Sequence, residues 1–180
     1  MPGERRALFL DRDGVVNIDI GYLHKPEDCQ FVTGIFELVR CARAAGYDVF
    51  IVTNQAGIAR GYYSEATYAA FTEWLLKRFA DEHAPITHVY HCPHHPTAGV
   101  GEYRTSCICR KPKPGMLLAA QREYGTDMAG SMMIGDSLSD MVAARAAGVR
   151  QRYLLNAQAL DDGSFVRIAS LADAMARLAV

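Results

Sequence analysis

The sequence predicts an α/β fold in which helices cover both faces of a parallel β-sheet. Short apolar runs alternate with amphipathic helical patterns along the chain, which is typical of successive βαβ units. The runs at residues 7–10 and 49–52 are apolar throughout, as expected of strands that are buried on both faces. Polar residues follow three of the runs directly, and sites in such sheets form beyond the carboxyl ends of strands.

Length and composition fit one ordinary domain, which we expect to span residues 1–180. Half of the 180 residues are hydrophobic and 22% are charged, which is enough for a sizeable core. The net charge of −1 shows no basic field for general nucleic-acid binding. We find neither a membrane-length apolar run nor a signal-peptide pattern. We therefore expect a cytoplasmic monomer with no nucleic-acid or membrane partner.

The first half of the chain is predicted to contain three strands, at residues 7–10, 48–52 and, more weakly, 86–91. Between the first two strands, apolar residues recur at helical spacing: Ile35, Leu38, Val39 and Ala42. Gly46 is expected to end that helix. Ser64 can cap a second helix. Its apolar stripe consists of Tyr68, Phe71, Leu75 and Phe79.

The second half is predicted to add three strands, at residues 131–134, 153–155 and 165–168. Pro114 suits the first turn of a helix that continues to Gly125. A second helix, at residues 138–147, should end at Gly148. Ser170 and Asp173 have the spacing of residues that open a helix, which would close the fold.

Two long irregular segments interrupt this pattern. Residues 15–33 leave the first strand, so they can fold over its end as a flap, and they include Asp19, Gly21 and Tyr22. Residues 92–109 are rich in proline, glycine and histidine and are interpreted as an inserted loop. Long ordered connections inside a compact domain are usually functional.

The first strand ends in two carboxylates, Asp11 and Asp13, and Gly14 then allows a sharp turn. The plain structural interpretation is an aspartate that caps a turn. The chemical interpretation is a site for Mg²⁺, which prefers oxygen ligands, with one carboxylate acting as a nucleophile toward phosphorus. The two interpretations are evenly balanced on this stretch alone.

The other strand ends favour the chemical interpretation, because Thr53 and Asp136 also follow apolar runs and can meet Asp11 in one crevice. Asp11 would attack phosphorus, and Asp13 would protonate the leaving oxygen and later accept a proton from water. Asp136 would hold Mg²⁺ together with Asp11. The Thr53 hydroxyl would meet phosphate oxygens, and Lys111 would offset the developing charge.

The inserted loop predicts a second metal site. It carries the ligand pairs Cys92-x-His94 and Cys107-x-Cys109, and three thiolates with one imidazole suit a structural Zn²⁺. His91 and His95 are alternatives to His94. The other alternative is a loop with incidental reduced cysteines. Cys29 and Cys41 are interpreted as ordinary free thiols, because the odd count of five cysteines argues against a disulfide framework.

Four ordered motifs across residues 9–140 resemble those of haloacid-dehalogenase-type phosphatases. They are Asp-Arg-Asp-Gly-Val-Val-Asn, Thr-Asn-Gln, Arg-Lys-Pro-Lys-Pro-Gly and Gly-Asp-Ser-Leu-Ser-Asp. Cys-Pro-His-His-Pro and Cys-x-Cys-Arg-Lys-Pro, between residues 92 and 112, resemble the zinc loop of the histidinol-phosphate and heptose-bisphosphate phosphatase branch. The resemblance implies a Rossmann-like sheet without a large cap domain.

The resemblance also implies residue roles. The nucleophile would be Asp11 and the acid/base Asp13, while Thr53 and Lys111 would bind the phosphate. Lys113 competes with Lys111 on charge alone, but only Lys111 directly precedes the Pro-x-Pro-Gly. The Mg²⁺ ligands would be Asp11, Asp13 and Asp136, with Asp140 in a supporting role or on a helix face. Substrate-binding residues would be Asp19, Gly21, Tyr22, Asn54, Gln55 and Arg110.

The function implied is Mg²⁺-dependent removal of the 7-phosphate of a heptose bisphosphate through an aspartyl-phosphate, in the supply of activated heptose for lipopolysaccharide. The alternatives are a histidinol-phosphate phosphatase, a 3′-phosphatase on nucleic-acid ends and a catalytically silent binding module. The near-neutral charge weakens the nucleic-acid alternative, and intact Asp11, Asp13, Lys111 and Asp136 weaken the silent one. The anomer preference stays open.

Overall fold

The computed structural model describes residues 5–155, 158 and 162–178, so the expected domain ends at residues 1 and 180 lie outside the described part. Within it, one six-stranded sheet has the order β3-β2-β1-β4-β5-β6, and every neighbouring pair is parallel. The strands are β1 (Arg5–Leu10), β2 (Asp48–Asn54), β3 (His88–Cys92), β4 (Thr126–Gly135), β5 (Gln151–Leu155) and β6 (Val166–Ile168). The predicted α/β class is confirmed.

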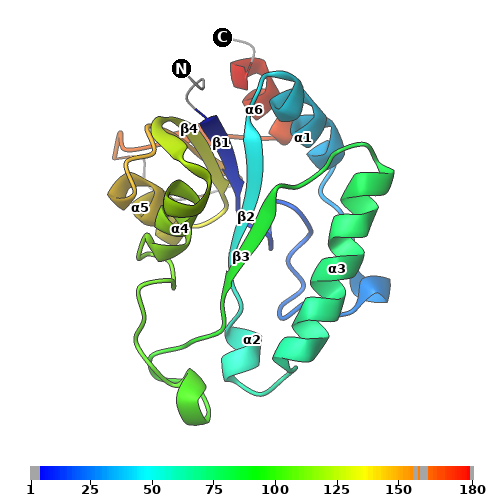
Figure 1. Ribbon diagram of the computed structural model, residues 1–180, viewed down its shortest axis with the longest axis vertical. Coiled ribbons are helices and arrows are strands. Elements are labelled where there is room, and N and C mark those ends of the chain that lie inside the picture. The colour runs from blue at the N-terminus through cyan, green and yellow to red at the C-terminus, as the bar shows by residue number, and fades with distance from the viewer. Residues whose placement is uncertain (1–4, 156–157, 159–161, 179–180) are drawn as a thin grey trace.

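Helices cover both faces of the sheet (Figure 1). One face carries α1 (Ile35–Ala44), α3 (Glu65–Asp81) and α6 (Leu171–Leu178). The other carries α4 (Gly115–Tyr124) and α5 (Leu138–Ala146). None of the helices in the described ranges combines the length and hydropathy that crossing a membrane requires.

The central strand β1 shows how the sequence produces these two layers. Alternate side chains of a strand point to opposite faces. Leu8 and Leu10 are fully buried in the core cluster beneath α1, α3 and α6, whereas Ala7 and Phe9 are fully buried beneath α4 and α5. A run that is apolar at every position is therefore what a strand covered on both faces requires.

Several elements differ from their predicted bounds. β4 begins at Thr126, five residues before the predicted strand, because Thr126 and Asp127 pair with Arg5 and Arg6 beyond a register shift. The short helix α2 (Ala56–Ala59) and the 3₁₀ turns Pro26–Asp28 and Gly101–Tyr103 were not predicted, since one turn leaves no periodicity. Pro114 precedes α4 as its N-cap instead of lying in its first turn.

The predicted helix starts at Ser64 and Ser170 are confirmed. The Ser64 hydroxyl accepts the Thr67 N–H, and the Asp173 carboxylate accepts the N–H groups of Ala169 and Ser170. The sheet order places β2, β1 and β4 side by side, so their carboxyl ends meet at one edge. That edge is where the predicted site residues should converge.

Candidate active site

A cavity of about 420 Å³ opens at the carboxyl ends of β1, β2 and β4. Its lining contains most of the predicted site residues: Asp11, Asp13, Asp19, Gly21, Tyr22, Asn54, Gln55, Arg110, Lys111 and Asp136. Segments from four separate parts of the chain thus contribute to one hollow. Thr53 does not line the cavity and is 1% exposed directly behind it.

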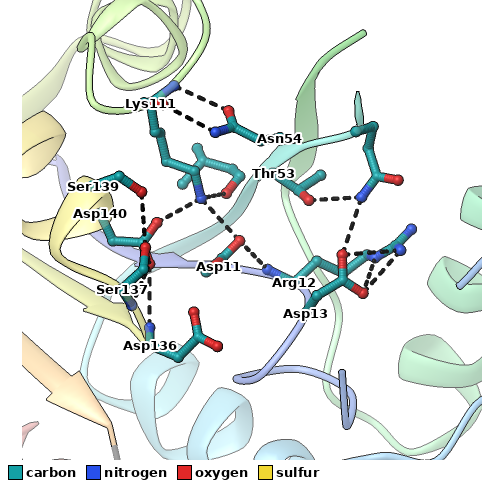
Figure 2. Close-up of polar contacts among 12 residues, drawn as sticks. Asp11, Arg12, Asp13, Thr53, Asn54, Lys111, Asp136, Ser137, Ser139 and Asp140 are labelled. Atoms are coloured by element: carbon teal, nitrogen blue, oxygen red, sulfur yellow. Dashed lines mark hydrogen bonds and ion pairs between the residues drawn. The ribbon is translucent and has the colours of Figure 1, made fainter. Parts of the chain in front are cut away.

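Lys111 lies at the centre of the charged groups (Figure 2). Its Nζ lies 2.8 Å from Asp11 Oδ1 and 2.6 Å from Asp140 Oδ1, and it donates to the Val52 carbonyl at 2.8 Å. Burial alone would lower the pKa of Lys111, but the Asp11 and Asp140 carboxylates outweigh burial and raise it. Lys111 is therefore a fixed cation next to the expected nucleophile. Lys113, the competing lysine, is exposed.

Asp140 is fully buried, which agrees with the supporting role expected for it. Its Oδ2 accepts the N–H groups of Asp136 and Ser137 and the Ser137 hydroxyl. Asp140 therefore caps α5 and holds Lys111 and the main chain of Asp136 at once, which ties β4 to the centre of the site.

Asp11, Asp136 and Asp140 offer carboxylate oxygens that all lie within 4.8 Å of one another. Burial raises the pKa of Asp11 well above its usual range, against the opposing charge of Lys111. Burial and then the charge of Asp140 raise the pKa of Asp136. Because Asp140 is engaged by Lys111 and N–H groups, Asp11 and Asp136 are the carboxylates left for a hard divalent cation, and their oxygens fit Mg²⁺.

Gly14 permits this approach of carboxylates. Its φ is +90°, and a Cβ atom built on it would lie 1.9 Å from Asp136 Oδ2. The turn after Asp13 therefore needs glycine both for its left-handed backbone and for the space that Asp136 occupies.

The Asp13 carboxylate lies outside that cluster, in a cage of donors. Its Oδ1 accepts from Arg12 and Asn17, each at 3.0 Å, and its Oδ2 accepts from Arg12 at 3.1 Å and from Gln55 at 3.3 Å. Arg12 is 2% exposed and also donates to the Leu23 carbonyl of the flap. These neighbours thus fix the direction of the Asp13 carboxylate, and its contact with a metal stays a prediction.

The polar residues at the end of β2 form hydrogen bonds with other residues of the site. The Asn54 side chain accepts the Lys111 N–H and donates to the Lys111 carbonyl, both at 3.0 Å. The Thr53 hydroxyl accepts from Gln55 at 2.8 Å, so its own proton stays available for another acceptor. Asn54 therefore holds the main chain of Lys111, and direct contact of Asn54 or Thr53 with a substrate stays a prediction.

Three residues of the flap, Asp19, Gly21 and Tyr22, line the cavity. Tyr22 has a φ of 54°, and its ring makes an edge contact with Tyr62 at 4.8 Å between centroids. His24 stacks on Tyr63 at 4.6 Å and donates from Nδ1 to the Tyr22 carbonyl at 2.7 Å. These contacts place Asp19, Gly21 and Tyr22 against the cavity without closing it.

The predicted zinc ligands also converge. The Sγ atoms of Cys92, Cys107 and Cys109 lie 3.0–3.4 Å apart, and His94 Nδ1 lies 3.8 Å from the Cys92 sulfur and 3.7 Å from the Cys109 sulfur. The three cysteines are free thiols. Three sulfurs and one imidazole nitrogen around one point are the donor set of a closed tetrahedral Zn²⁺ site.

The two rival histidines have other partners. His91 lies 3.6 Å from Glu65 and packs on the Tyr68 ring, while His95 Nδ1 accepts the N–H groups of Thr97 and Ala98. The structure therefore favours His94 among the three. The cluster is joined to the active site by Arg110, which directly follows Cys109 and donates to the His94 carbonyl at 3.2 Å.

Four residues that the sequence did not single out also contribute: Arg12, Asn17, Tyr63 and Ser137. Arg12 and Asn17 belong to the first motif, so their position there was an available signal. Ser137 follows Asp136 and could have been recognised as a helix cap. Tyr63 carries no sequence signal, because only folding brings it to Gln55.

The chain is similar to a described family and to named phosphatases. A family model described as HAD-hydrolase-like matches residues 108–156. D-glycero-beta-D-manno-heptose-1,7-bisphosphate 7-phosphatase of Vibrio cholerae serotype O1 is 48% identical over 149 residues, which are 83% of this chain and 80% of that protein. D-glycero-alpha-D-manno-heptose-1,7-bisphosphate 7-phosphatase of Burkholderia mallei is 47% identical over 174 residues, 97% of this chain and 89% of that protein.

A solved structure of a phosphatase is also similar to this chain. D,D-heptose 1,7-bisphosphate phosphatase from B. bronchiseptica, complexed with magnesium and phosphate, has a TM-score of 0.84 and 31% identity, with 97% of this chain and 98% of that one covered. The chain belongs to the haloacid-dehalogenase-type phosphatases and, within them, to the heptose-bisphosphate phosphatase family. The resemblance found in the sequence is confirmed.

Proposed function

We propose that this protein removes the 7-phosphate of D-glycero-D-manno-heptose 1,7-bisphosphate. The observation that carries the proposal is the placement of Asp11, Asp13, Lys111 and Arg110 around one cavity. A nucleophile, a caged carboxyl group and two cations are what a substrate with two phosphates needs. The relatives named for this activity support the same substrate.

The first step forms a bond between an Asp11 oxygen and phosphorus while the bond from phosphorus to the leaving oxygen breaks. Asp13, in its protonated form, donates its proton to that oxygen and so releases the sugar as an alcohol. Lys111, already paired with Asp11, offsets charge on the transferring group. The Thr53 hydroxyl is the further donor proposed for the phosphate oxygens.

The second step hydrolyses the aspartyl-phosphate. Asp13, now a carboxylate, takes a proton from a water molecule whose oxygen attacks phosphorus, and Asp11 is released. The cage of Arg12, Asn17 and Gln55 keeps Asp13 in one place for both proton transfers.

Mg²⁺ is proposed as the cofactor of the reaction, and Asp11, Asp13 and Asp136 would hold it. When bound, it neutralises the charge between an anionic nucleophile and an anionic phosphate. A structural neighbour contains magnesium and phosphate, which supports this assignment. A structural Zn²⁺ is proposed for Cys92, His94, Cys107 and Cys109, whose ligand atoms leave no position open for a substrate.

Recognition of the rest of the substrate is proposed for Arg110 and the flap. Arg110 would bind the 1-phosphate, because a guanidinium fork suits phosphate oxygens. Asp19, Gly21 and Tyr22 would meet sugar hydroxyl groups. We further propose a cytoplasmic monomer that binds neither nucleic acid nor membranes.

Phosphate release from a panel of esters tests the function. The panel contains both anomers of the heptose 1,7-bisphosphate, histidinol phosphate and a simple sugar monophosphate, with the Asp11→Asn variant as the blank. We expect the highest kcat/KM for a heptose bisphosphate, and the panel also reveals the anomer, on which the named relatives differ. A preference for histidinol phosphate would instead establish the alternative function.

A further inference from the structure

The side chain of Gln55 bridges the acid/base to a buried tyrosine. Its Nε2 lies 3.3 Å from Asp13 Oδ2 and 2.8 Å from Thr53 Oγ1, and its Oε1 accepts from the Tyr63 hydroxyl at 2.5 Å. Gln55 is 2% exposed and Tyr63 is 7% exposed, so water does not readily replace these partners. The N–H end of the Gln55 amide thus faces acceptors, and its carbonyl end faces a donor.

The direction of this amide matters to Asp13. An amide has a donor end and an acceptor end, and a half-turn would place Oε1 against Asp13 Oδ2, where two acceptors would face each other. The Tyr63 hydroxyl is the donor that holds Oε1 away from Asp13. Burial raises the pKa of Tyr63 to about 12, so this hydroxyl keeps its proton at neutral pH.

Tyr63 is itself held firmly. A Cβ atom on Gly57 would lie 2.2 Å from the Tyr63 ring, so the ring occupies space that only a glycine leaves free. The ring also stacks on the imidazole of His24 in the flap and packs in one buried cluster with Ile58 and Tyr68. The packing fixes the ring, and the ring fixes where its hydroxyl points.

We propose that Tyr63 is a positioning residue for Asp13, which acts by holding the Gln55 amide with its N–H group on Asp13 Oδ2. The proposal rests on the proposed function, because it assumes that Asp13 gives its proton to the leaving oxygen. The competing possibility is that Arg12 and Asn17 place Asp13 sufficiently by themselves.

Substrates whose leaving groups differ in their need for a proton distinguish these two possibilities. A sugar phosphate leaves as an alcohol and needs the proton of Asp13, whereas p-nitrophenyl phosphate releases a stable phenolate without it. The ratio kcat/KM reports on substrate binding and on formation of the aspartyl-phosphate, and not on its later hydrolysis. A misplaced Asp13 should therefore slow the sugar phosphate much more than the aryl phosphate.

The test compares Tyr63→Phe with the wild-type holoenzyme on both esters. Proton transfer is worth about 10²–10⁴-fold, so its partial loss should lower kcat/KM for the heptose bisphosphate about tenfold, and for the aryl phosphate less than about threefold. Tyr47→Phe is the matched control, because Tyr47 is 3% exposed and its hydroxyl is also hydrogen-bonded, here as the acceptor of an Arg6 N–H group, at the opposite end of β2. It should leave the ratio between the esters unchanged.

A double-variant cycle tests whether Tyr63 acts through Gln55. In a Gln55→Ala background, Tyr63→Phe should have no further effect on the ratio between the esters, since coupled residues are not additive. The proposal would be overturned if Tyr63→Phe lost activity equally on both esters or not at all, or if its effect were fully additive with that of Gln55→Ala. Wild-type activity on the heptose bisphosphate would in each case leave the proposed function intact. A wild-type protein that hydrolyses neither ester would overturn the function itself.

Discussion

Lys111 Nζ lies 2.8 Å from Asp11 Oδ1, although the two residues are 100 positions apart in the chain. Asp11 directly follows the central strand β1, and Lys111 lies two residues after the predicted zinc loop. The Asn54 side chain, at the end of β2, bonds the main chain of Lys111 on both sides. The contact between the expected nucleophile and its cation is therefore held by two strands and a loop together.

Replacement of Lys111 by methionine should abolish turnover and destabilise the fold. The substitution leaves the Asp11 and Asp140 carboxylates without their buried cation, and loss of one partner of a buried ion pair costs about 3–5 kcal/mol. Phosphate release and urea unfolding of the metal-free protein measure the two effects. Lys113→Met, at an exposed lysine, is the matched control and should stay within about 0.5 kcal/mol of wild type. Wild-type turnover by Lys111→Met would exclude the role given to Lys111.

Asp13→Asn should lower kcat by about 10²–10⁴-fold, because an amide cannot supply or accept the proton. The side chain keeps its size, but its new NH2 group would face a donor of the cage and the buried Arg12 would lose its anionic partner, so the melting temperature should fall as well. Asp11→Asn should be inactive, since the amide is a poor nucleophile. Steady-state kinetics alongside thermal melts provide the measurement. If Asp13→Asn kept near-normal kcat on the sugar phosphate, another group would have to be the acid/base.

The sheet and the convergence of several site residues could be predicted because a polar residue directly after an apolar run marks the end of a buried strand. Asp11, Thr53 and Asp136 each follow an apolar run, and the order of parallel strands brings such ends to one edge. The convergence of Cys92, His94, Cys107 and Cys109 was predictable for a related reason, since short Cys-x-His and Cys-x-Cys pairs hold two side chains near one point whatever the wider fold.

The supporting contacts could not be predicted in the same way. Asp140 bonds Lys111, and Tyr63 bonds Gln55, only because the helices pack at particular positions on the sheet. Burial is also invisible in a single sequence. Arg12 looks like a surface charge between two acids, yet it is 2% exposed and bonds Asp13 and the flap.

One tightly held zinc per chain is expected, distinct from exchangeable Mg²⁺. Cys107→Ala should remove it and, because Arg110 and Lys111 follow the cluster, should lower activity as well as the melting temperature. Elemental analysis of the metal-washed protein gives the zinc content. Cys41→Ala, a partly buried thiol on α1, is the control and should retain both zinc and activity. Washed wild-type protein without zinc would end the structural-zinc assignment.

Arg110→Ala should weaken kcat/KM for the heptose bisphosphate much more than for a sugar monophosphate. Arg110 lines the cavity and is tethered to the His94 carbonyl, which leaves other guanidinium N–H groups for a second phosphate. A charge-assisted bond is worth about 1.5–3 kcal/mol, or about ten- to a hundredfold. Arg104→Ala changes an exposed arginine of the same loop and should affect neither ester. Equal losses on the two esters would show that Arg110 does not read the second phosphate.

Gly14→Ala should impair Mg²⁺ activation through Asp136. The new Cβ atom would lie 1.9 Å from Asp136 Oδ2, so the carboxylate must move from the position in which it converges with Asp11. We expect the Mg²⁺ concentration for half-maximal activity to rise at least about tenfold, as expected when a carboxylate ligand worth at least about 1.4 kcal/mol is displaced. An alanine at the left-handed φ of +90° is strained, which should lower the free energy of unfolding by about 1–3 kcal/mol.

Gly46→Ala separates these two effects of a methyl group. Gly46 has a similar φ of +83°, but a Cβ atom there meets nothing within 4 Å, and the residue lies just after α1. Both variants should therefore lose stability through backbone strain, as thermal melts would show, whereas only Gly14→Ala should need more Mg²⁺. An unchanged Mg²⁺ requirement in Gly14→Ala would mean that the position of the Asp136 carboxylate does not control the metal, and the assignment of Asp136 as its ligand would fail.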